Sequence, residues 1–251
     1  MWHLPLTFLA GLIGEGYATV IGSGGVLIQF ALATLGLPLA TVVATDIGGA
    51  QGADWGIIVA SARSIWNNKK MLAMLTFPTL LGGITGTTFL VYIPVTLLKI
   101  VLIVGLSTLF TYVLIGKKAE LVAFESLEIR PKKYPLIFLV MLVLGVYGNV
   151  SGVGSGTFAK FAYLSLLRIS FVESLGIASI IALPATIYSV VITGWSGFIA
   201  WPYFLMIFIG AFLGANFVAR HVRTIPERYL RSLLLVVISL YLLYLIASLI
   251  A

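Results

Sequence analysis

The sequence predicts an all-α membrane protein that crosses the bilayer several times, and three observations carry this prediction. Of the 251 residues, 61% are hydrophobic and 9% are charged, whereas a soluble domain is about 45–50% apolar and about 25% charged. Apolar stretches close to the length of a bilayer crossing recur along the whole chain. The longest polar stretch, residues 116–135, is too short to form a separate soluble domain.

Composition also excludes several classes of function. The chain has no cysteine, which excludes disulfides, thiol catalysis and thiolate metal sites. Its two histidines, His3 and His221, lie near expected span ends, so we expect no histidine metal site and no cofactor. The net charge of +7 is typical of basic cytoplasmic loops rather than of nucleic-acid binding. The apolar N-terminus lacks a preceding basic region and is interpreted as a first span, not a cleaved signal.

The two halves of the chain repeat each other in the same order. Residues 21–35 align with 153–167, residues 80–86 with 208–214, and residues 94–104 with 226–236. We therefore divide the chain into a first membrane repeat at 1–116, a cytoplasmic linker at 117–133 and a second membrane repeat at 134–251. Duplicated membrane units are typical of transporters, whose substrate site lies where the repeats meet.

Each predicted repeat begins with a long apolar segment that a glycine-rich turn must break. As one helix, segment 4–36 or 134–168 would be about 50 Å long, beyond the roughly 30 Å of a bilayer core. We expect two short helices in each segment, followed by three transmembrane helices. These are expected at 38–62, 71–92 and 95–116, and then at 171–193, 201–220 and 226–249. Whether the broken segments cross fully or are re-entrant stays open.

The basic residues favour an inverted arrangement of the two repeats. If each broken segment enters and leaves the membrane, each repeat has an odd number of elements and the repeats run in opposite directions. Then 13 of the 15 basic residues lie on the cytoplasmic side, with Lys99 outside and Lys160 within the membrane. A single crossing per segment would instead place 8 inside and 6 outside, which the positive-inside rule disfavours. Both termini are then expected to be extracytoplasmic.

Four ionisable residues fall inside the expected spans, where each is costly and is a functional candidate by default. They are Glu15, Asp46, Asp54 and Lys160, and Gln51 lies between the two aspartates. We expect the surplus acids to be protonated or bound to a cation, so that Asp46 or Asp54 couples transport to a proton. A permanent structural bridge to Lys160 is the alternative. Glycines around Gly52, and Pro184 at the matching place, predict that both of these spans are interrupted.

The paired glycine turns, GSGG at 22–25 and GSGT at 154–157, are the expected anion site. Neither is a phosphate-binding loop of a soluble nucleotide-binding fold, because the lysine spacing and the context do not fit. Main-chain N–H groups at the start of a helix bind anions, and hydroxyls assist them. The predicted ligands are Ser23, Gly24, Gly25, Ser155, Gly156, Thr157 and Lys160. The alternative is that these glycines only allow helices to pack closely.

The chain resembles the TauE/SafE family of sulfite and organosulfur exporters over nearly its whole length. The resemblance rests on the two glycine turns, on "VVAT" and "ESLGIAS", on "GGITG" and "GAFLG", and on "PERYLRSLLLVVISLYLLYL". It implies a multi-pass permease of the prokaryotic plasma membrane that moves small anionic sulfur compounds. The resemblance indicates the substrate class much less specifically than the fold.

The predicted function is a secondary transporter, an exporter of a small anion such as sulfite or an organosulfonate, with proton coupling and alternating access. The alternative within transport is a cation-coupled or cation-carrying transporter that uses Glu15, Asp46 and Asp54. An intramembrane enzyme is disfavoured, because no nucleophile–base pair is evident. The expected partners are the lipid bilayer and the anionic substrate, with nucleic acid excluded and a homodimer left open.

Overall fold

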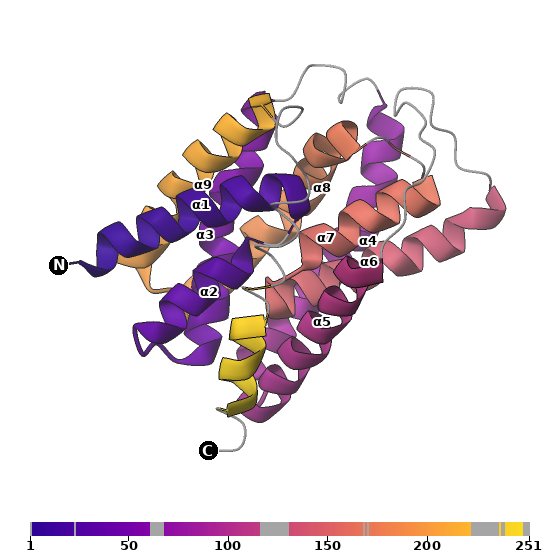
Figure 1. Cartoon of the computed structure of the whole chain (residues 1–251). Helices are drawn as coiled ribbons and strands as arrows, with labels where there is room; N and C mark the ends of the chain where they lie inside the picture. The colour runs from indigo at the N-terminus through magenta and orange to yellow at the C-terminus, as the bar shows by residue number, and fades with distance from the viewer. Residues whose placement is uncertain are drawn as a thin grey trace.

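The computed structural model describes residues 2–22, 24–60, 68–115, 131–167, 169, 171–221, 236 and 239–247. The elements within them are all helices (Figure 1), which confirms the predicted class. They are α1 (His3–Ile21), α2 (Gly25–Thr34), α3 (Leu39–Ala60), α4 (Lys69–Tyr92), α5 (Val95–Ile115), a short η3 (Pro131–Lys133), α6 (Tyr134–Ser151), α7 (Ser155–Ala162), η4 (Tyr163–Leu167), α8 (Phe171–Trp195) and α9 (Trp201–His221). Most of the predicted linker and of the predicted last span lies outside the described residues.

Within the described residues, four stretches are long and apolar enough to cross a membrane: Lys69–Tyr92, Pro131–Ser151, Ser174–Trp195 and Trp201–His221. Three of them correspond to transmembrane helices that we predicted. The fourth, Pro131–Ser151, contains α6, which we expected to be the first of two short helices in the second broken segment. Residues 239–247, which belong to the predicted last span, form a helix as well. Its Tyr241 and Leu245 share one apolar cluster with Leu98 and Leu102 of α5, and Figure 1 shows this C-terminal helix lying beside α5.

The glycine turns break both first segments, as predicted. Helix α1 ends at Gly22, which has a φ of 89°, and α2 begins at Gly25. Helix α6 ends at Gly152, with a φ of 69°, and Gly154, with a φ of 75°, precedes α7. Positive φ is readily adopted only by glycine, so these residues allow the chain to leave one helix and start another.

The two halves of the chain are interleaved rather than stacked side by side. Helix α9 packs on α1 and α3, whereas α4 packs on α6 and α8. Each half therefore supplies its third long helix to the other half. Figure 1 shows α1, α3 and α9 gathered on one flank and α4 with α6 on the other. Exchanging the halves reproduces the same pairs of neighbours.

Matching glycines make the matching contacts in these two groups. A Cβ on Gly210 of α9 would collide with the main chain of Phe8, and a Cβ on Gly82 of α4 would collide with that of Leu142. One turn later, Gly214 and Gly86 make the same approach to Leu12 and Val146, respectively. Small residues let helix backbones approach closely, which stabilises helix pairs in membranes. The contacts advance together along the chain, so α4 runs parallel to α6, and α9 runs parallel to α1.

Neither α3 nor α8 is interrupted, so our prediction for Gly52 and Pro184 was wrong. Helix α3 is continuous from Leu39 to Ala60, and α8 continues through Pro184. The α3 glycines serve close packing instead. A Cβ on Gly52 would collide with the main chain of Phe208, and a Cβ on Gly56 would lie 2.5 Å from the carbonyl oxygen of Phe212. Contact with α9, rather than a chain break, accounts for the glycine-rich sequence.

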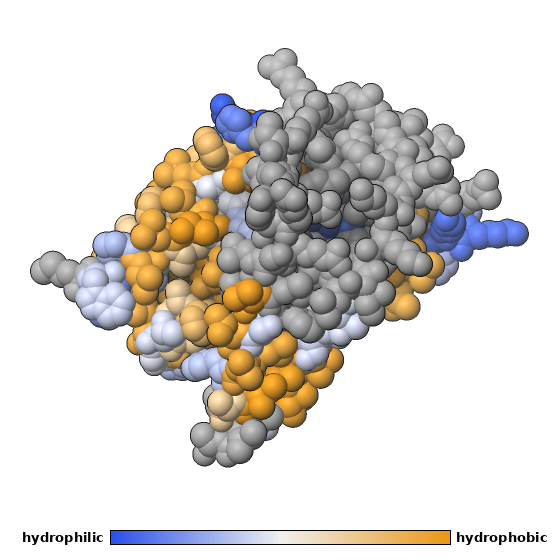
Figure 2. All heavy atoms as spheres, viewed as in Figure 1, coloured by the Kyte–Doolittle hydropathy of each residue, from blue (hydrophilic) through white to orange (hydrophobic). Residues whose placement is uncertain are grey.

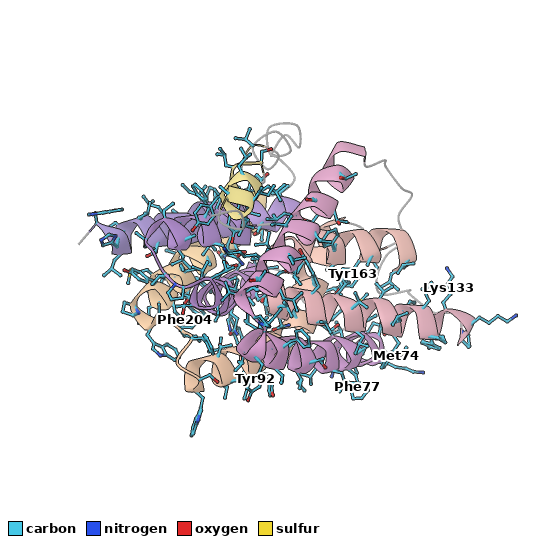
Figure 3. All side chains as sticks on the ribbon, turned by 90° about the horizontal axis from the view of Figure 1, so that it is seen from below. Met74, Phe77, Tyr92, Lys133, Tyr163 and Phe204 are labelled. Atoms are coloured by element: carbon cyan, nitrogen blue, oxygen red, sulfur yellow. The ribbon has the colours of Figure 1, made fainter. Side chains whose placement is uncertain are left out.

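The outer surface is apolar, as a lipid-facing surface must be. On α9, large apolar side chains recur every four residues, at Leu205, Ile209, Leu213 and Phe217, and each is 46–66% exposed. The glycines of the same helix face inward. Figure 2 shows apolar atoms over much of the described surface, with hydrophilic atoms toward its margins. Figure 3 shows Lys133 projecting beyond the end of the bundle.

Candidate functional site

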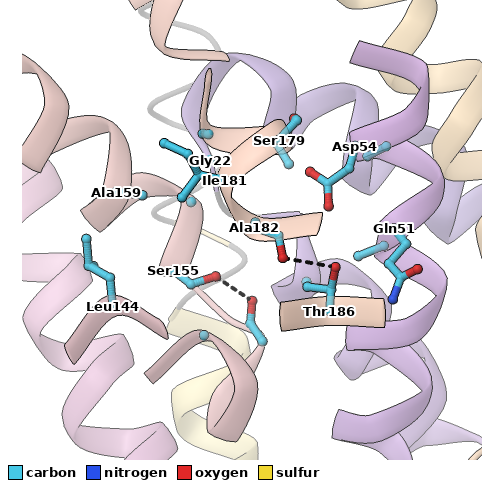
Figure 4. A pocket seen from close by; sticks show the side chains of 18 of the residues that line it. Gly22, Gln51, Asp54, Leu144, Ser155, Ala159, Ser179, Ile181, Ala182 and Thr186 are labelled. Carbon is cyan, nitrogen blue, oxygen red and sulfur yellow. Dashed lines mark hydrogen bonds between the residues drawn. The ribbon is translucent and has the colours of Figure 1, made fainter. Parts of the chain in front are cut away.

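A cavity of about 200 Å³ lies between the two halves of the chain and is lined by residues from both (Figure 4). It brings together most of the residues that we predicted from sequence. Those that line it are Glu15, Gly24, Gly25, Asp46, Gln51, Asp54, Ser155, Gly156 and Lys160. Thr157 is buried but does not line the cavity. Ser23 lies outside the described residues.

The two glycine turns touch each other at the edge of this cavity. A Cβ on Gly156 would lie 2.6 Å from the carbonyl oxygen of Gly22, and a Cβ on Gly22 would lie 2.5 Å from the carbonyl carbon of Gly156. No side chain fits between backbones at that distance. The glycines therefore have both of the structural roles that the sequence suggested. They break the helices, and they also allow the two breaks to pack closely against each other.

In this structure, Lys160 is hydrogen-bonded to the end of α1. Its Nζ donates hydrogen bonds of 2.8 Å to the carbonyl oxygens of Ala18 and Thr19. The last carbonyl groups of a helix lack partners within it, and at membrane depth they need donors from elsewhere. Lys160 also interacts electrostatically with Glu15. The lysine that we predicted as an anion ligand thus also stabilises the broken helix of the other half.

Gln29, in the first half of the chain, donates to the end of the broken helix of the second half. Its Nε2 donates a 2.5 Å hydrogen bond to the carbonyl oxygen of Ser151, at the end of α6. It donates a second, of 2.8 Å, to Oδ2 of Asp46. Its Oε1 accepts a hydrogen bond of 2.9 Å from the Tyr241 hydroxyl. Each short helix, α2 and α7, therefore provides a donor to the broken helix of the opposite half.

Our sequence reasoning did not select Gln29 or Tyr241. A signal was present for Gln29, since it is a polar amide within the otherwise apolar α2. The alignment of residues 21–35 with 153–167 also places Gln29 beside the position of Lys160. Tyr241 gave no comparable signal, because a tyrosine in a membrane helix is ordinary. Asn149, which lines the cavity from α6, was missed as well.

Asp46 is 1% exposed, and within the described part of the chain one of its two carboxylate oxygens has a hydrogen-bond partner. Oδ2 accepts from Gln29, whereas Oδ1 is buried without a hydrogen bond among the residues that the structure describes. The carboxylate lies against the first glycine turn and against the end of α6, because a Cβ on Gly25 or Gly152 would lie 2.7 or 2.8 Å from Oδ2. An unpartnered buried carboxylate oxygen is costly. Oδ1 of Asp46 is therefore an atom at which a bound proton or cation would be stabilised.

The other polar groups of the cavity are divided between donors and acceptors. Asp54 is partly exposed and accepts a hydrogen bond from Ser179 of α8, and Figure 4 shows both side chains at the cavity. Within the described ranges, Nε2 of Gln51 and Oδ1 of Asn149 are buried without a partner. Glu15 is 8% exposed and lines the cavity.

Three carboxyl groups and one ammonium group therefore surround a small space. The part of the chain that the structure describes holds no cluster of three or more His, Asp or Glu residues with metal-binding geometry. The cavity offers hydroxyl, amide and ammonium groups that suit an anion. It also offers carboxyl groups that can take up and release protons.

A family model described as "Sulfite exporter TauE/SafE" matches residues 6–245, which is nearly the whole chain. The chain belongs to this family. A probable membrane transporter protein of Haemophilus influenzae is 24% identical over 248 residues, covering 93% of this chain and 90% of that protein. The probable membrane transporter protein YfcA of Escherichia coli K12 is 23% identical over 238 residues, covering 93% of this chain and 86% of YfcA.

A third relative, the probable membrane transporter protein ORF9 of a Sinorhizobium species, is 22% identical over 237 residues and is covered to 88% of its length. These matches confirm the family that the sequence resembles. The TauE/SafE protein described here is a multi-pass membrane transporter, and its family is one of transporters rather than enzymes.

Proposed function

We propose that this TauE/SafE protein is a secondary transporter that exports a small anion, such as sulfite or an organosulfonate. The observation that carries the proposal is the cavity where the two glycine turns meet, with Lys160 and several buried polar groups around it. The family description names sulfite, and transporters built from repeats bind their substrates between those repeats.

The size of the cavity favours a small ion. Pockets for drug-sized ligands measure about 300–1,000 Å³, whereas this cavity measures about 200 Å³. One water takes about 30 Å³ in the liquid, so an oxyanion with a few waters suits the space. Donors for the anion come from Ser155, Gln51 and Lys160, which line the cavity.

The charges around the cavity require that anion binding is coupled to protonation of a carboxyl group. Glu15, Asp46 and Asp54 would repel an anion if all three were ionised. Binding an anion beside them is therefore favoured when Asp46 or Asp54 carries a proton. Lys160 must also shift part of its bonding from the α1 carbonyls to the anion. Rocking of the group α1, α3 and α9 against the group α4, α6 and α8 would then carry the anion and change the side from which the proton exchanges.

We also propose that the two membrane repeats, 1–116 and 134–251, are inverted. The support is the direction of the packed helices. Helix α3 ends at the same end of the bundle as α9, because Gly48, Gly52 and Gly56 contact Phe204, Phe208 and Phe212 in turn. Helix α4 starts shortly after α3 and runs parallel to α6, so α1 runs opposite to its counterpart α6, and α4 runs opposite to its counterpart α9.

The basic residues support this orientation. Lys69 and Lys70 begin α4, Lys132 and Lys133 directly precede α6, and Arg220 lies in the last turn of α9. The helix directions place all of them at one end of the bundle, which the positive-inside rule makes cytoplasmic. Helix α1 starts at the opposite end, so the N-terminus is extracytoplasmic, and the C-terminus follows by the symmetry of the repeats.

A second candidate is transport coupled to a monovalent cation instead of a proton. The specific support is that Oδ1 of Asp46 and Oδ1 of Asn149 are both buried, unpartnered acceptors within the described part of the cavity lining. Hard cations take oxygen ligands of this kind. If sodium at constant pH, rather than a pH gradient, drives sulfite movement, this candidate replaces the proton.

The test is efflux of sulfite from proteoliposomes that contain the purified protein, with and without an imposed pH gradient. We expect the wild-type protein to release sulfite faster with the gradient. Lys160→Ala should reduce this release to the rate of empty liposomes. Lys133→Ala, a lysine at the exposed start of α6, is the matched control and should retain transport. Sulfite, thiosulfate, taurine and acetate compared in the same assay would reveal the substrate class, and no gain over empty liposomes for any of them contradicts the proposal.

A further inference from the structure

The amide of Gln29 has only one orientation that suits its neighbours. Oε1 faces a donor, the Tyr241 hydroxyl, and Nε2 faces two acceptors, Asp46 Oδ2 and the Ser151 carbonyl. A reversed amide would place an oxygen against two oxygens and an NH₂ group against a hydroxyl. Gln29 and Tyr241 are both 0% exposed, so water cannot compensate for such a reversal.

This arrangement makes the two oxygens of Asp46 unequal. Oδ2 is held by the Gln29 amide, whereas Oδ1 has no hydrogen-bond partner among the described residues, and Asp46 lines the cavity. A proton on Oδ2 would point at the N–H of Gln29. A proton on Oδ1 leaves the existing hydrogen bond in place, because the carbonyl oxygen of a neutral carboxyl group still accepts.

We propose that Gln29 is a positioning residue that directs the coupling proton to Oδ1 of Asp46, and that Tyr241 fixes the Gln29 amide for this task. The proposal rests on the proposed function, in which Asp46 carries that proton. In the step itself a hydronium ion that enters the cavity gives up a proton, so that one of its O–H bonds breaks and one O–H bond forms at Oδ1. The hydronium ion becomes water, the carboxylate loses its charge, and the hydrogen bond from Gln29 to Oδ2 remains.

The titratable groups around Asp46 are consistent with this assignment. Glu15 on α1 and Tyr241 on the C-terminal helix interact electrostatically with Asp46. Asp54 lies two turns further along α3, bonded to Ser179, and Lys160 on α7 interacts with Glu15. Gln29 is the residue whose hydrogen bond distinguishes one oxygen of Asp46 from the other.

The test is infrared difference spectroscopy of the full-length protein in lipid, comparing acidic with alkaline buffer. The carbonyl band of protonated Asp46 is identified as the band that Asp46→Asn removes. In Gln29→Met the Oδ2 carbonyl loses its donor, so we expect this band to shift to higher wavenumber. In Tyr241→Phe the amide is no longer held, and we expect a smaller shift in the same direction. Tyr244→Phe, on the more exposed side of the same helix, is the matched control and should leave the band in place.

Tyr241→Phe removes a single hydroxyl group, so this variant still tests the positioning role if Gln29→Met does not fold. If Asp46→Asn removes a band but neither variant shifts it, the positioning role is overturned while Asp46 remains the proton carrier. If Asp46→Asn removes no band, both the positioning role and proton coupling through Asp46 are overturned. If Asp46→Asn also exports sulfite with an unchanged response to the pH gradient, the same conclusion follows from transport.

Discussion

The Nζ of Lys160 lies 2.8 Å from the carbonyl oxygen of Thr19, a residue of the opposite half of the chain. Gln29 makes the reciprocal contact with the carbonyl oxygen of Ser151. Each half thus closes the broken helix of the other with a donor from its own short helix. A rocking motion of the group α1, α3 and α9 against the group α4, α6 and α8 would stretch or exchange these two contacts. They would then lie where a transporter controls its conformational change.

Lys160 should contribute to folding as well as to transport. Lys160→Met removes the donor to the carbonyl group of Thr19, whereas the Ala18 carbonyl keeps its hydrogen bond from the Gly22 N–H. An unsatisfied buried group costs about 1–3 kcal/mol. We expect a lower thermal unfolding temperature in detergent, partly restored in Lys160→Arg, which keeps a charged donor. Wild-type stability in Lys160→Met would contradict the role of Lys160 at the end of α1.

Two glycine substitutions can distinguish the stability that comes from the contact between the glycine turns from the cost of backbone strain. Gly22 and Gly36 both have positive φ, but a Cβ on Gly22 would meet the second turn, whereas one on Gly36 would meet nothing within 4 Å. Left-handed backbone costs a non-glycine residue roughly 1–2 kcal/mol. Gly36→Ala should therefore cost about that much, and Gly22→Ala clearly more, in thermal unfolding. Equal losses would show that the contact between the turns contributes nothing.

The interleaved packing predicts that matched glycines respond alike. Gly210→Leu in α9 and Gly82→Leu in α4 each place a side chain in the main chain of the facing helix, so both should fold poorly. Leu213→Ala, on the outward face of α9, should be tolerated because that side chain faces lipid. The measurement is the yield of monodisperse protein in size-exclusion chromatography. A large loss for one glycine and none for the other would contradict equivalent packing.

Asp46, rather than Asp54, should carry the coupling proton. Oδ1 of Asp46 lacks a partner in the described part of the chain, whereas Asp54 is bonded to Ser179 and partly exposed. Asp46→Asn cannot exchange a proton, so sulfite efflux should lose its acceleration by a pH gradient. Asp54→Asn should retain most of it. The opposite result in the proteoliposome assay would assign the proton to Asp54.

The absence of cysteine from the chain makes the proposed orientation directly testable. Trp195 ends α8 and is 92% exposed, and Lys133 lies at the exposed start of α6. In intact cells, a membrane-impermeant maleimide should label Trp195→Cys. Lys133→Cys should be labelled only after the membrane is opened. Labelling of both variants, or the reverse order, would overturn the proposed topology.

Several features of the fold could be predicted from sequence because they follow from local rules. The roughly 30 Å of the bilayer core and the length of the first segments required a break, and GSGG and GSGT marked its place. The ionisable residues were few, so Asp46, Asp54 and Lys160 stood out. The prediction for Gly52 and Pro184 failed because a glycine that breaks a helix and one that packs it against a neighbour look the same in one sequence.

The sequence by itself determined that the chain is a helical membrane protein with two similar halves and with polar groups at matching breaks, since composition and periodicity are local properties. Only the tertiary structure decided which groups meet. It placed α9 with α1, brought Gly22 against Gly156, and joined Gln29 to Asp46 and Tyr241. The physical reason is that a buried donor must find an acceptor wherever the packing brings one. Gln29 and Asp46 are 17 positions apart. The other contacts join residues more than a hundred positions apart, which no local pattern records.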